Sequence, residues 1–271
     1  MNVIVTGASG LLGRAVVTEF KRNSWKVLGL ARTRVRDDLV QIDLTDIDAV
    51  SGIVREFKPH AIIHCAAEKS PDKIQMDPDS YYPLNVTVPG ELAKLAAEVK
   101  AVYVFISTDY VLVELNELLL EINPGSCILR IPVIYGGEEN VEESAISSLI
   151  NAIRSNGVKE VSNYEIRFPS HTTDIASIIY QLVQRKLHGP LLEHIIYHWC
   201  GAEALTKYQM AKMIAENFGQ RHDNIIPFNF ASPGVPRPKN AHLSCERLEN
   251  LGIRRHTRFE EGIQEFRKFF Q

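Results

Sequence analysis

Short apolar runs alternate with amphipathic segments through the first half of the chain. The apolar runs predict buried strands at residues 2–6, 26–31, 39–44, 60–67, 101–107 and 126–136. The segments between them carry apolar residues at helical spacing and predict helices at 10–22, 48–57 and 90–99. Strands that are apolar throughout and separated by such helices are typical of βαβ units, in which the sheet is parallel and covered on both faces.

The alternation breaks after residue 136. Further elements are predicted as helices at 142–156, 206–219 and 259–270 and as short strands near 164–170 and 195–201. The last helix is amphipathic, and its apolar face is predicted to pack into the core, with a partner-binding face as the alternative. We therefore predict an α/β fold, a doubly wound parallel Rossmann sheet with a smaller C-terminal mixed α/β lobe. The predicted domains are 1–136, with return segments at about 160–200, and 137–271, interleaved with the first.

Composition and charge narrow the class of protein. A formal net charge of −3 without a basic stripe argues against nucleic acid as a partner. No apolar run reaches the ~18–20 residues of a membrane span. The first predicted strand follows Met1 directly, which leaves no room for a signal peptide, so a cytoplasmic location is expected. The four cysteines match no disulfide or zinc spacing: Cys65, Cys127, Cys200 and Cys245.

A glycine-rich turn joins the first strand to the first helix. Residues 6–13 read TGASGLLG, which places Gly7, Gly10 and Gly13 at the spacing G-x-x-G-x-x-G. In such a loop one glycine permits the tight turn, one lets the backbone approach a pyrophosphate and one lets the helix pack on the sheet. The amide groups at the helix start then face the phosphates. This pattern predicts a dinucleotide site, whereas a plain βα turn is the alternative.

The end of the second strand indicates which dinucleotide is bound. An NAD-dependent enzyme usually has an acidic residue there, but this chain has Arg32 and Arg34, and its first acid is Asp37. A guanidinium suits a 2′-phosphate through paired charge-assisted hydrogen bonds, so NADP(H) is the predicted cofactor, and Arg14 is placed to help. Solvated loop charges are the alternative interpretation of these arginines.

Several segments together resemble a known family. TGASGLLG, IDLTD, HCAAEKSPD, ISTDYV, LRIPVIYG and RPKNAHLSC occur in the order seen in extended short-chain dehydrogenases, and they resemble the dTDP-4-dehydrorhamnose reductase branch. HCAAEKSPD, EESAISSLI, RFPSHTTDIA and GAEALTKYQMAKMIAENFG are most similar to the regulatory β subunits of methionine adenosyltransferase. This resemblance covers nearly the whole chain. It implies a catalytic subunit of methionine adenosyltransferase as the partner and a place in one-carbon metabolism.

The resemblance also implies roles for single residues. Thr108 matches the Ser/Thr whose hydroxyl bonds a substrate carbonyl in the reductases, and it is the one candidate catalytic residue. The segment 9–13 is expected at the pyrophosphate, 32–34 at the 2′-phosphate, and Asn85 in the network beside the sheet. The predicted cofactor-binding residues are Gly7, Ser9, Gly10, Leu11, Leu12, Gly13, Arg14, Arg32, Thr33, Arg34, Asp43, Leu44, Cys65, Ala66, Ala67, Lys69, Asn85 and Thr108. Among these, 43–44 are expected at the adenine, and 65–67 and Lys69 on the ribose side.

The catalytic pair of the reductases is missing from the sequence. In that family a Tyr-x-x-x-Lys helix follows the STDYV segment, the tyrosine donating a proton and the lysine lowering its pKa. Here Val111 runs almost directly into residues 117–125, which resemble the end of that helix, so about 25–30 family residues have no counterpart before Glu117. Either the segment is absent from the protein or the printed sequence omits a flexible stretch. Whether the protein is an enzyme is therefore left open.

Other residues are weaker candidates for a catalytic, metal-binding or substrate-binding role. Tyr208 and Lys212 have the right spacing, but they lie about a hundred residues too late and are interpreted as core periodicity. Tyr110 lacks a lysine four residues on, because Glu114 stands there. The histidines predict no metal site, although His171 is a candidate for facing a cleft between the lobes. Arg167 and Asp174 resemble the family's segment at the lobe boundary, and a loop-fixing salt bridge is the alternative role for both. Arg237 resembles the family residue that would approach the sugar nucleotide in a reductase.

Two functions follow from these observations. The first is an NADP-binding regulatory subunit of methionine adenosyltransferase, non-catalytic or weakly catalytic. The alternative is an NADPH-dependent reductase of a 4-keto nucleotide sugar.

Overall fold

A computed structural model describes residues 1–36, 38–108, 113–189, 196–234 and 236–271. Within these residues the largest sheet has seven strands in the order β11-β6-β5-β4-β1-β2-β3, and every strand pairing in it is parallel. The strands are β1 (Asn2–Thr6), β2 (Lys26–Ala31), β3 (Leu39–Gln41), β4 (Ala61–His64), β5 (Val102–Thr108), β6 (Cys127–Ile131) and β11 (Ile196–His198). The predicted doubly wound Rossmann sheet is confirmed.

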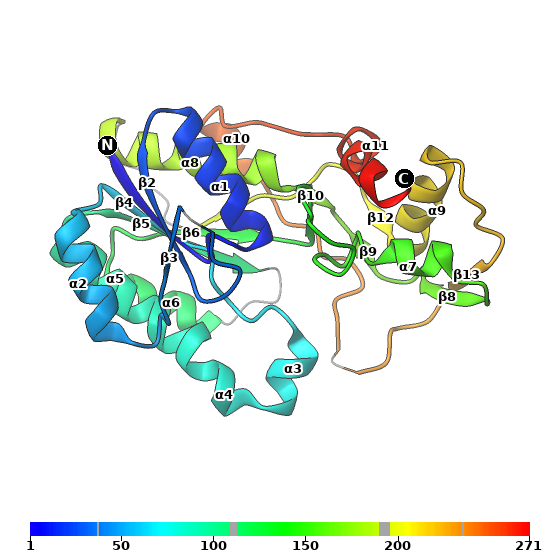
Figure 1. The fold of residues 1–271 in the computed structure, drawn as a ribbon, viewed down its shortest axis with the longest axis horizontal. Coiled ribbons are helices and arrows are strands. Elements are labelled where there is room, and N and C mark those ends of the chain that lie inside the picture. The colour runs from blue at the N-terminus through cyan, green and yellow to red at the C-terminus, as the bar shows by residue number, and fades with distance from the viewer. Residues whose placement is uncertain (37, 109–112, 190–195, 235) are drawn as a thin grey trace.

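Helices cover both faces of this sheet (Figure 1). On one face lie α1 (Leu11–Arg22), α8 (Thr172–His188) and α10 (Glu246–Asn250); on the other lie α2 (Ile47–Phe57), α5 (Val88–Glu98) and α6 (Val113–Ile122). Side chains alternate along each strand, so Val3 and Val5 pack under the first group while Ile4 packs under the second. Burial on both faces explains why the strands read as unbroken apolar runs.

Short helices follow β4 before α5 begins. These are α3 (Pro71–Met76), α4 (Pro78–Tyr82) and the π-helical turn η1 (Pro83–Thr87). Ser70 and Asp77 cap the first two, each accepting a hydrogen bond from a main-chain amide of the helix it precedes, and proline stands in the first turn of both helices. None of these three elements was predicted, because the segment has no apolar period long enough to show a helix.

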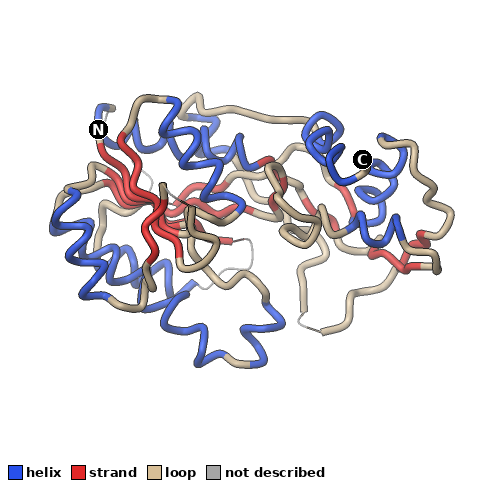
Figure 2. The backbone as a smooth tube through the Cα atoms, in the orientation of Figure 1, coloured by secondary structure: helices blue, strands red, loops and turns tan. Residues whose placement is uncertain are grey.

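A second lobe lies beyond the sheet (Figure 2). Its elements are β7 (Ile134–Tyr135), α7 (Leu149–Arg154), β8 (Lys159–Ser162), β9 (Ile166–Arg167), β10 (Ser170–His171), β12 (Leu205–Thr206), α9 (Lys207–Asn217), β13 (Ile225–Phe228), α11 (Phe259–Gly262) and the 3₁₀ helix η2 (Ile263–Phe269). They enclose a separate apolar core around Ile150, Ile214 and Phe266. The C-terminal segment packs into this core, as predicted. The chain passes back to the sheet for α8 and β11, and again for α10; the residue boundaries of the two domains stay a prediction.

Three predicted elements are wrong in detail. The strand at 126–136 is two strands, β6 and β7, separated by Pro132. The helix at 142–156 shrinks to α7, because the hydroxyl of Ser144 accepts the amides of Ile146 and Ser147 and holds a turn instead. The final helix changes to 3₁₀ geometry at Ile263.

Candidate dinucleotide site

The glycine loop is packed too closely to admit side chains at two positions. Gly7 has φ +64, and a Cβ there would lie 2.9 Å from the backbone of Ala66 at the end of β4. A Cβ on Gly13 would lie 2.1 Å from the carbonyl oxygen of Gly7. The amide of Gly10 donates to that same oxygen at 2.8 Å. The first turn of α1 therefore lies directly on the loop, and only glycine fits at both contacts.

Helix α1 begins without a cap of its own. Gly10 occupies the N-cap position with no side-chain hydrogen bond, and the first turn holds no acidic residue. Its last turn carries Lys21 and Arg22. The first amides of a helix have no partners inside the helix and carry partial positive charge. This end of α1 is therefore suited to an external anion such as a phosphate.

The segment after β4 runs along the same edge of the sheet. His64 pairs with Thr6 in the strand register, so Cys65, Ala66 and Ala67 continue beside the glycine loop. Burial raises the pKa of Cys65 to about 12, so its thiol stays protonated at neutral pH. Asn85 fixes the segment with two hydrogen bonds to the Glu68 backbone: its Oδ1 accepts from the amide at 2.9 Å and its Nδ2 donates to the carbonyl at 3.1 Å.

The end of β2 lies on the other side of the loop. The hydroxyl of Ser9 donates to the carbonyl of Thr33 at 2.9 Å and so ties the two segments together. Arg32 is 73% exposed, and among the residues that the structure describes its ionic neighbour is Asp43, at 3.9 Å. Hydrogen bonds from Thr45 lower the pKa of Asp43. The side chain of Leu44 packs into the core of the sheet layer.

A carboxylate from the second lobe reaches across to this loop. Both oxygens of Glu143 accept from Arg14, at 2.8 Å each, and its Oε1 also accepts from Arg34 at 2.7 Å. The amide of Glu139 donates to Oε2 at 2.8 Å, and Lys69 Nζ donates to the Glu143 carbonyl oxygen at 2.7 Å. Three of the predicted cofactor-binding residues thus meet on one acidic residue that the sequence analysis did not single out.

Glu143 is ionised and only 6% exposed. Burial raises its pKa, but the hydrogen bonds from Arg14, the Glu139 amide and Arg34 outweigh burial and lower the pKa to about 2. Burial also lowers the pKa of Lys69, against the opposing charge of Glu143. The only sequence signal for Glu143 was the acidic run at 138–143, which does not say which carboxylate turns inward.

Thr108 ends β5 at the same edge, paired in register with Ile131 of β6. The residues that follow it, 109–112, lie outside the described part of the chain, and Tyr110 with them. Tyr208 and Lys212 are on α9 in the second lobe, where Tyr208 packs against the apolar core and Lys212 lies 3.9 Å from Glu216. The structure therefore does not bring this pair to the sheet edge.

The residues at the lobe boundary fix loops. Buried Asp174 accepts from Arg255 at 3.1 Å and from the amide and hydroxyl of Thr257 at 2.6 and 2.9 Å. Arg167 donates to the carbonyl of Pro238, and Arg237 lies 3.3 Å from Asp72. Asp174 thus forms a salt bridge, as the alternative interpretation held, and its partner in that bridge is Arg255.

His171 does not face a cleft. It is buried, its Nδ1 lies 2.8 Å from the hydroxyl of Thr173, and its ring packs edge-on against Tyr135. Among the residues that the structure describes, no group of three or more His, Cys, Asp or Glu is placed to hold a metal ion. No helix within the same residues is long and apolar enough to cross a membrane.

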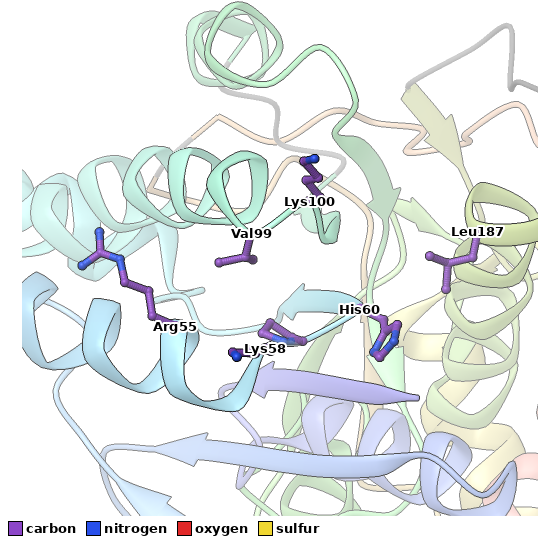
Figure 3. A pocket seen from close by; sticks show the side chains of 7 residues that line it. Arg55, Lys58, His60, Val99, Lys100 and Leu187 are labelled. Atoms are coloured by element: carbon purple, nitrogen blue, oxygen red, sulfur yellow. The ribbon is translucent and has the colours of Figure 1, made fainter.

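A hollow of about 430 Å³ lies at the opposite end of the strands (Figure 3). Lys58 and His60 line it just before β4, and Lys100 lines it just before β5. Arg55 at its margin is paired with Glu98. Open α/β sheets bind their ligands at the carboxyl ends of the strands, so the glycine-loop edge remains the candidate site.

Comparison with known proteins places this arrangement in a family. The sequence matches the family described as RmlD substrate binding domain in two stretches, residues 1–114 and 112–271. The chain belongs to this family. The two matching stretches of the RmlD family meet at residues 112–114, the place where the Tyr-x-x-x-Lys segment has no counterpart.

Similar proteins include both methionine adenosyltransferase β subunits and dTDP-4-dehydrorhamnose reductases. Methionine adenosyltransferase 2 subunit beta of Bos taurus is 39% identical over 289 aligned positions, covering 97% of this chain and 86% of the relative. That alignment is longer than the 271 residues of the chain, so the relative carries residues that this chain lacks. The dTDP-4-dehydrorhamnose reductase of Aggregatibacter actinomycetemcomitans is 27% identical, covering 77% of this chain and 76% of the relative.

A solved structure agrees with the fold. The dTDP-4-dehydrorhamnose reductase of Bacillus anthracis, solved in complex with NADP, superposes with a TM-score of 0.83. It is 23% identical, and the match covers 99% of this chain and 98% of that one. At this identity the comparison shows the shared RmlD-family fold.

Proposed function

We propose that this chain is an NADP(H)-binding regulatory subunit of methionine adenosyltransferase. The observation that carries the proposal is the 39% identity to a methionine adenosyltransferase β subunit along 97% of the chain. In this role the chain binds a catalytic subunit that makes S-adenosylmethionine and modulates it. The expected setting is cytoplasmic one-carbon metabolism.

The residues at the glycine-loop edge fit a dinucleotide phosphate group. Helix α1 begins uncapped, with Gly7 and Gly13 keeping the loop free of side chains. Arg32 is exposed at the end of β2 and has one distant ionic neighbour. Arg34 is half-exposed and donates to Glu143 through Nη1, whereas a guanidinium has five N–H donors in all. These residues bind and orient phosphates, with Arg32 and Arg34 assigned to the 2′-phosphate.

The catalytic competence of the site is the point on which the two candidate functions differ. In the reductases the nicotinamide supplies a hydride and the Tyr/Lys pair manages the proton. The family match breaks where that pair belongs. Thr108 at the end of β5 is a hydrogen-bond donor, but its hydroxyl is too weak an acid to replace the tyrosine. This favours binding without turnover.

The second candidate is an NADPH-dependent reductase of a 4-keto nucleotide sugar. Thr108, at the carboxyl end of β5 beside the candidate site, favours it. This candidate requires a proton donor from outside the printed sequence or from the undescribed residues 109–112.

One set of measurements separates the candidates. The intact mass of the purified chain is determined first, because a mass above the 30.5 kDa of the printed sequence reveals an omitted segment. NADPH and NADH are then titrated by fluorescence, and NADPH oxidation is followed with a dTDP-4-keto sugar. The proposal expects NADPH binding, preference over NADH and no turnover. Steady turnover of the keto sugar would establish the reductase instead.

A further inference from the structure

Two cysteines that are 45 residues apart in the sequence meet where Cys245 packs against the core of the sheet layer. Cys200 follows β11, where the chain leaves the sheet, and Cys245 precedes α10, where the chain returns to it. Their sulfur atoms are 3.9 Å apart. The sequence showed no disulfide spacing because the contact is made by the fold.

The hydrogen bonds of the pair make one thiol more acidic than the other. Cys245 Sγ accepts from the amide of Cys200 at 3.3 Å, whereas Cys200 Sγ donates to the carbonyl of Leu243 at 3.2 Å. The hydrogen bond from Cys200 lowers the pKa of Cys245 to about 7, against burial and the charge of Glu249. The same hydrogen bond and burial raise the pKa of Cys200. Cys245 is therefore the thiol of the pair that ionises more readily and acts as the nucleophile, whereas Cys200 keeps its proton at neutral pH.

The pair is reachable from solvent. Both sulfur-bearing residues line a cleft of about 690 Å³, together with Trp199, His242, Arg254 and Arg255. Cys245 is half-buried and Cys200 is 5% exposed. A small polar oxidant thus has access to Cys245.

We propose that Cys200 and Cys245 form a redox-active dithiol that a hydroperoxide converts into an intramolecular disulfide. The Cys245 thiolate attacks a peroxide oxygen, the O–O bond breaks, and the leaving hydroxide takes up a proton. Cys200 then attacks the resulting sulfenic sulfur, forms the S–S bond and releases a second water. Two thiols lose two electrons and two protons, and hydrogen peroxide becomes two waters.

The disulfide would close the segment that holds β12, α9 and β13 of the second lobe. Both ends of this segment cross between the lobe and the sheet, so the bond would tie the two crossings together. Cys65 supplies a matched comparison, because it is the other half-buried thiol and burial keeps it protonated.

The test treats the full chain with equimolar hydrogen peroxide, alkylates the remaining thiols and identifies crosslinked tryptic peptides by mass spectrometry. The expected product is a peptide pair joined through Cys200 and Cys245, with Cys65 and Cys127 alkylated once the chain is unfolded. Oxidised glutathione in a parallel reaction tells disulfide exchange from peroxide chemistry. Fluorescence of a Trp25→Phe chain, whose remaining tryptophan is Trp199, should fall on oxidation and return with dithiothreitol.

Variants assign the two sulfur roles. Cys245→Ser should consume peroxide at least tenfold more slowly than the unmodified chain, and Cys200→Ser should stop at a sulfenic or sulfinic acid on Cys245. Cys65→Ser should consume peroxide and form the 200–245 crosslink at the same rate as the unmodified chain. An unmodified chain that yields no 200–245 crosslink, or a Cys245→Ser chain that consumes peroxide at the original rate, overturns the proposal.

Discussion

Replacing Glu143 with glutamine removes the negative charge that joins Arg14 and Arg34 across the boundary between sheet and lobe. The pKa of Glu143 is lowered from 4.5 to about 2, and each pKa unit corresponds to about 1.4 kcal/mol, so the upper limit of the ionic stabilisation is about 3 kcal/mol. Arg34 is 46% exposed, and solvent screens its share. We expect Glu143→Gln to lower the free energy of unfolding by about 1–2 kcal/mol at pH 7.

The lowered pKa of Glu143 also determines how the stability difference between the two chains changes with pH. The pKa of Glu143 is depressed in the folded state, so its stabilisation is present above the unfolded pKa of 4.5 and is lost as pH falls toward about 2. The difference between the original chain and the variant should therefore be constant from pH 7 to about pH 5 and should narrow below that.

Urea unfolding, followed by tryptophan fluorescence at a series of pH values, measures this difference. The control is Glu142→Gln, because Glu142 is exposed and its carboxylate accepts only from Asn151 among the hydrogen bonds described. The control should change the unfolding free energy by less than about 0.5 kcal/mol. Equal stability of Glu143→Gln and the original chain at pH 7, or a difference that does not narrow in acid, would refute the reasoning.

Three further predictions concern the same edge and the lobe boundary. Gly13→Ala forces a Cβ to within 2.1 Å of the Gly7 oxygen. The NADPH affinity measured by calorimetric titration should therefore fall about tenfold or more, and the melting temperature should drop. An unchanged affinity and melting temperature would contradict this. Arg32→Ala removes one charge-assisted phosphate contact, so the NADPH Kd should rise about tenfold while the NADH Kd stays constant. Arg22→Ala, at the far end of α1, is the control. An equal rise in the NADH Kd would show that Arg32 does not bind the 2′-phosphate. Asp174→Asn leaves Arg255 and Thr257 without their buried carboxylate, so the unfolding free energy should fall by about 2–3 kcal/mol in urea; a loss below about 0.5 kcal/mol would count against its loop-fixing role.

Continuous apolar strands made the sheet predictable. The bounds of β1 and β2 match the predicted runs at 2–6 and 26–31 because these strands are buried on both faces and end at polar or glycine residues. Helix α8 was missed although Ile175, Ile179 and Leu182 repeat with a helical period. It is buried around much of its circumference, so it lacks the contrasting polar face that marks a surface helix.

The candidate site, like the fold, has one part that the sequence predicted and one part that it did not. The glycine loop is local, since its strand, turn and helix are consecutive, and the sequence located it. The ion pairs of Glu143 join residues 109 and 129 positions apart, and the sulfur contact joins residues 45 apart. Such contacts depend on how the lobe meets the sheet, which no local pattern encodes.

The central claim is regulation of a methionine adenosyltransferase. The most direct measurement follows S-adenosylmethionine formation by the catalytic subunit from the same organism as increasing amounts of this chain are added with NADPH present. The account predicts that the rate or the KM for methionine changes and saturates at a fixed ratio of the two chains. A rate that stays constant at every ratio, together with NADPH-dependent reduction of a 4-keto nucleotide sugar by the chain alone, would contradict it.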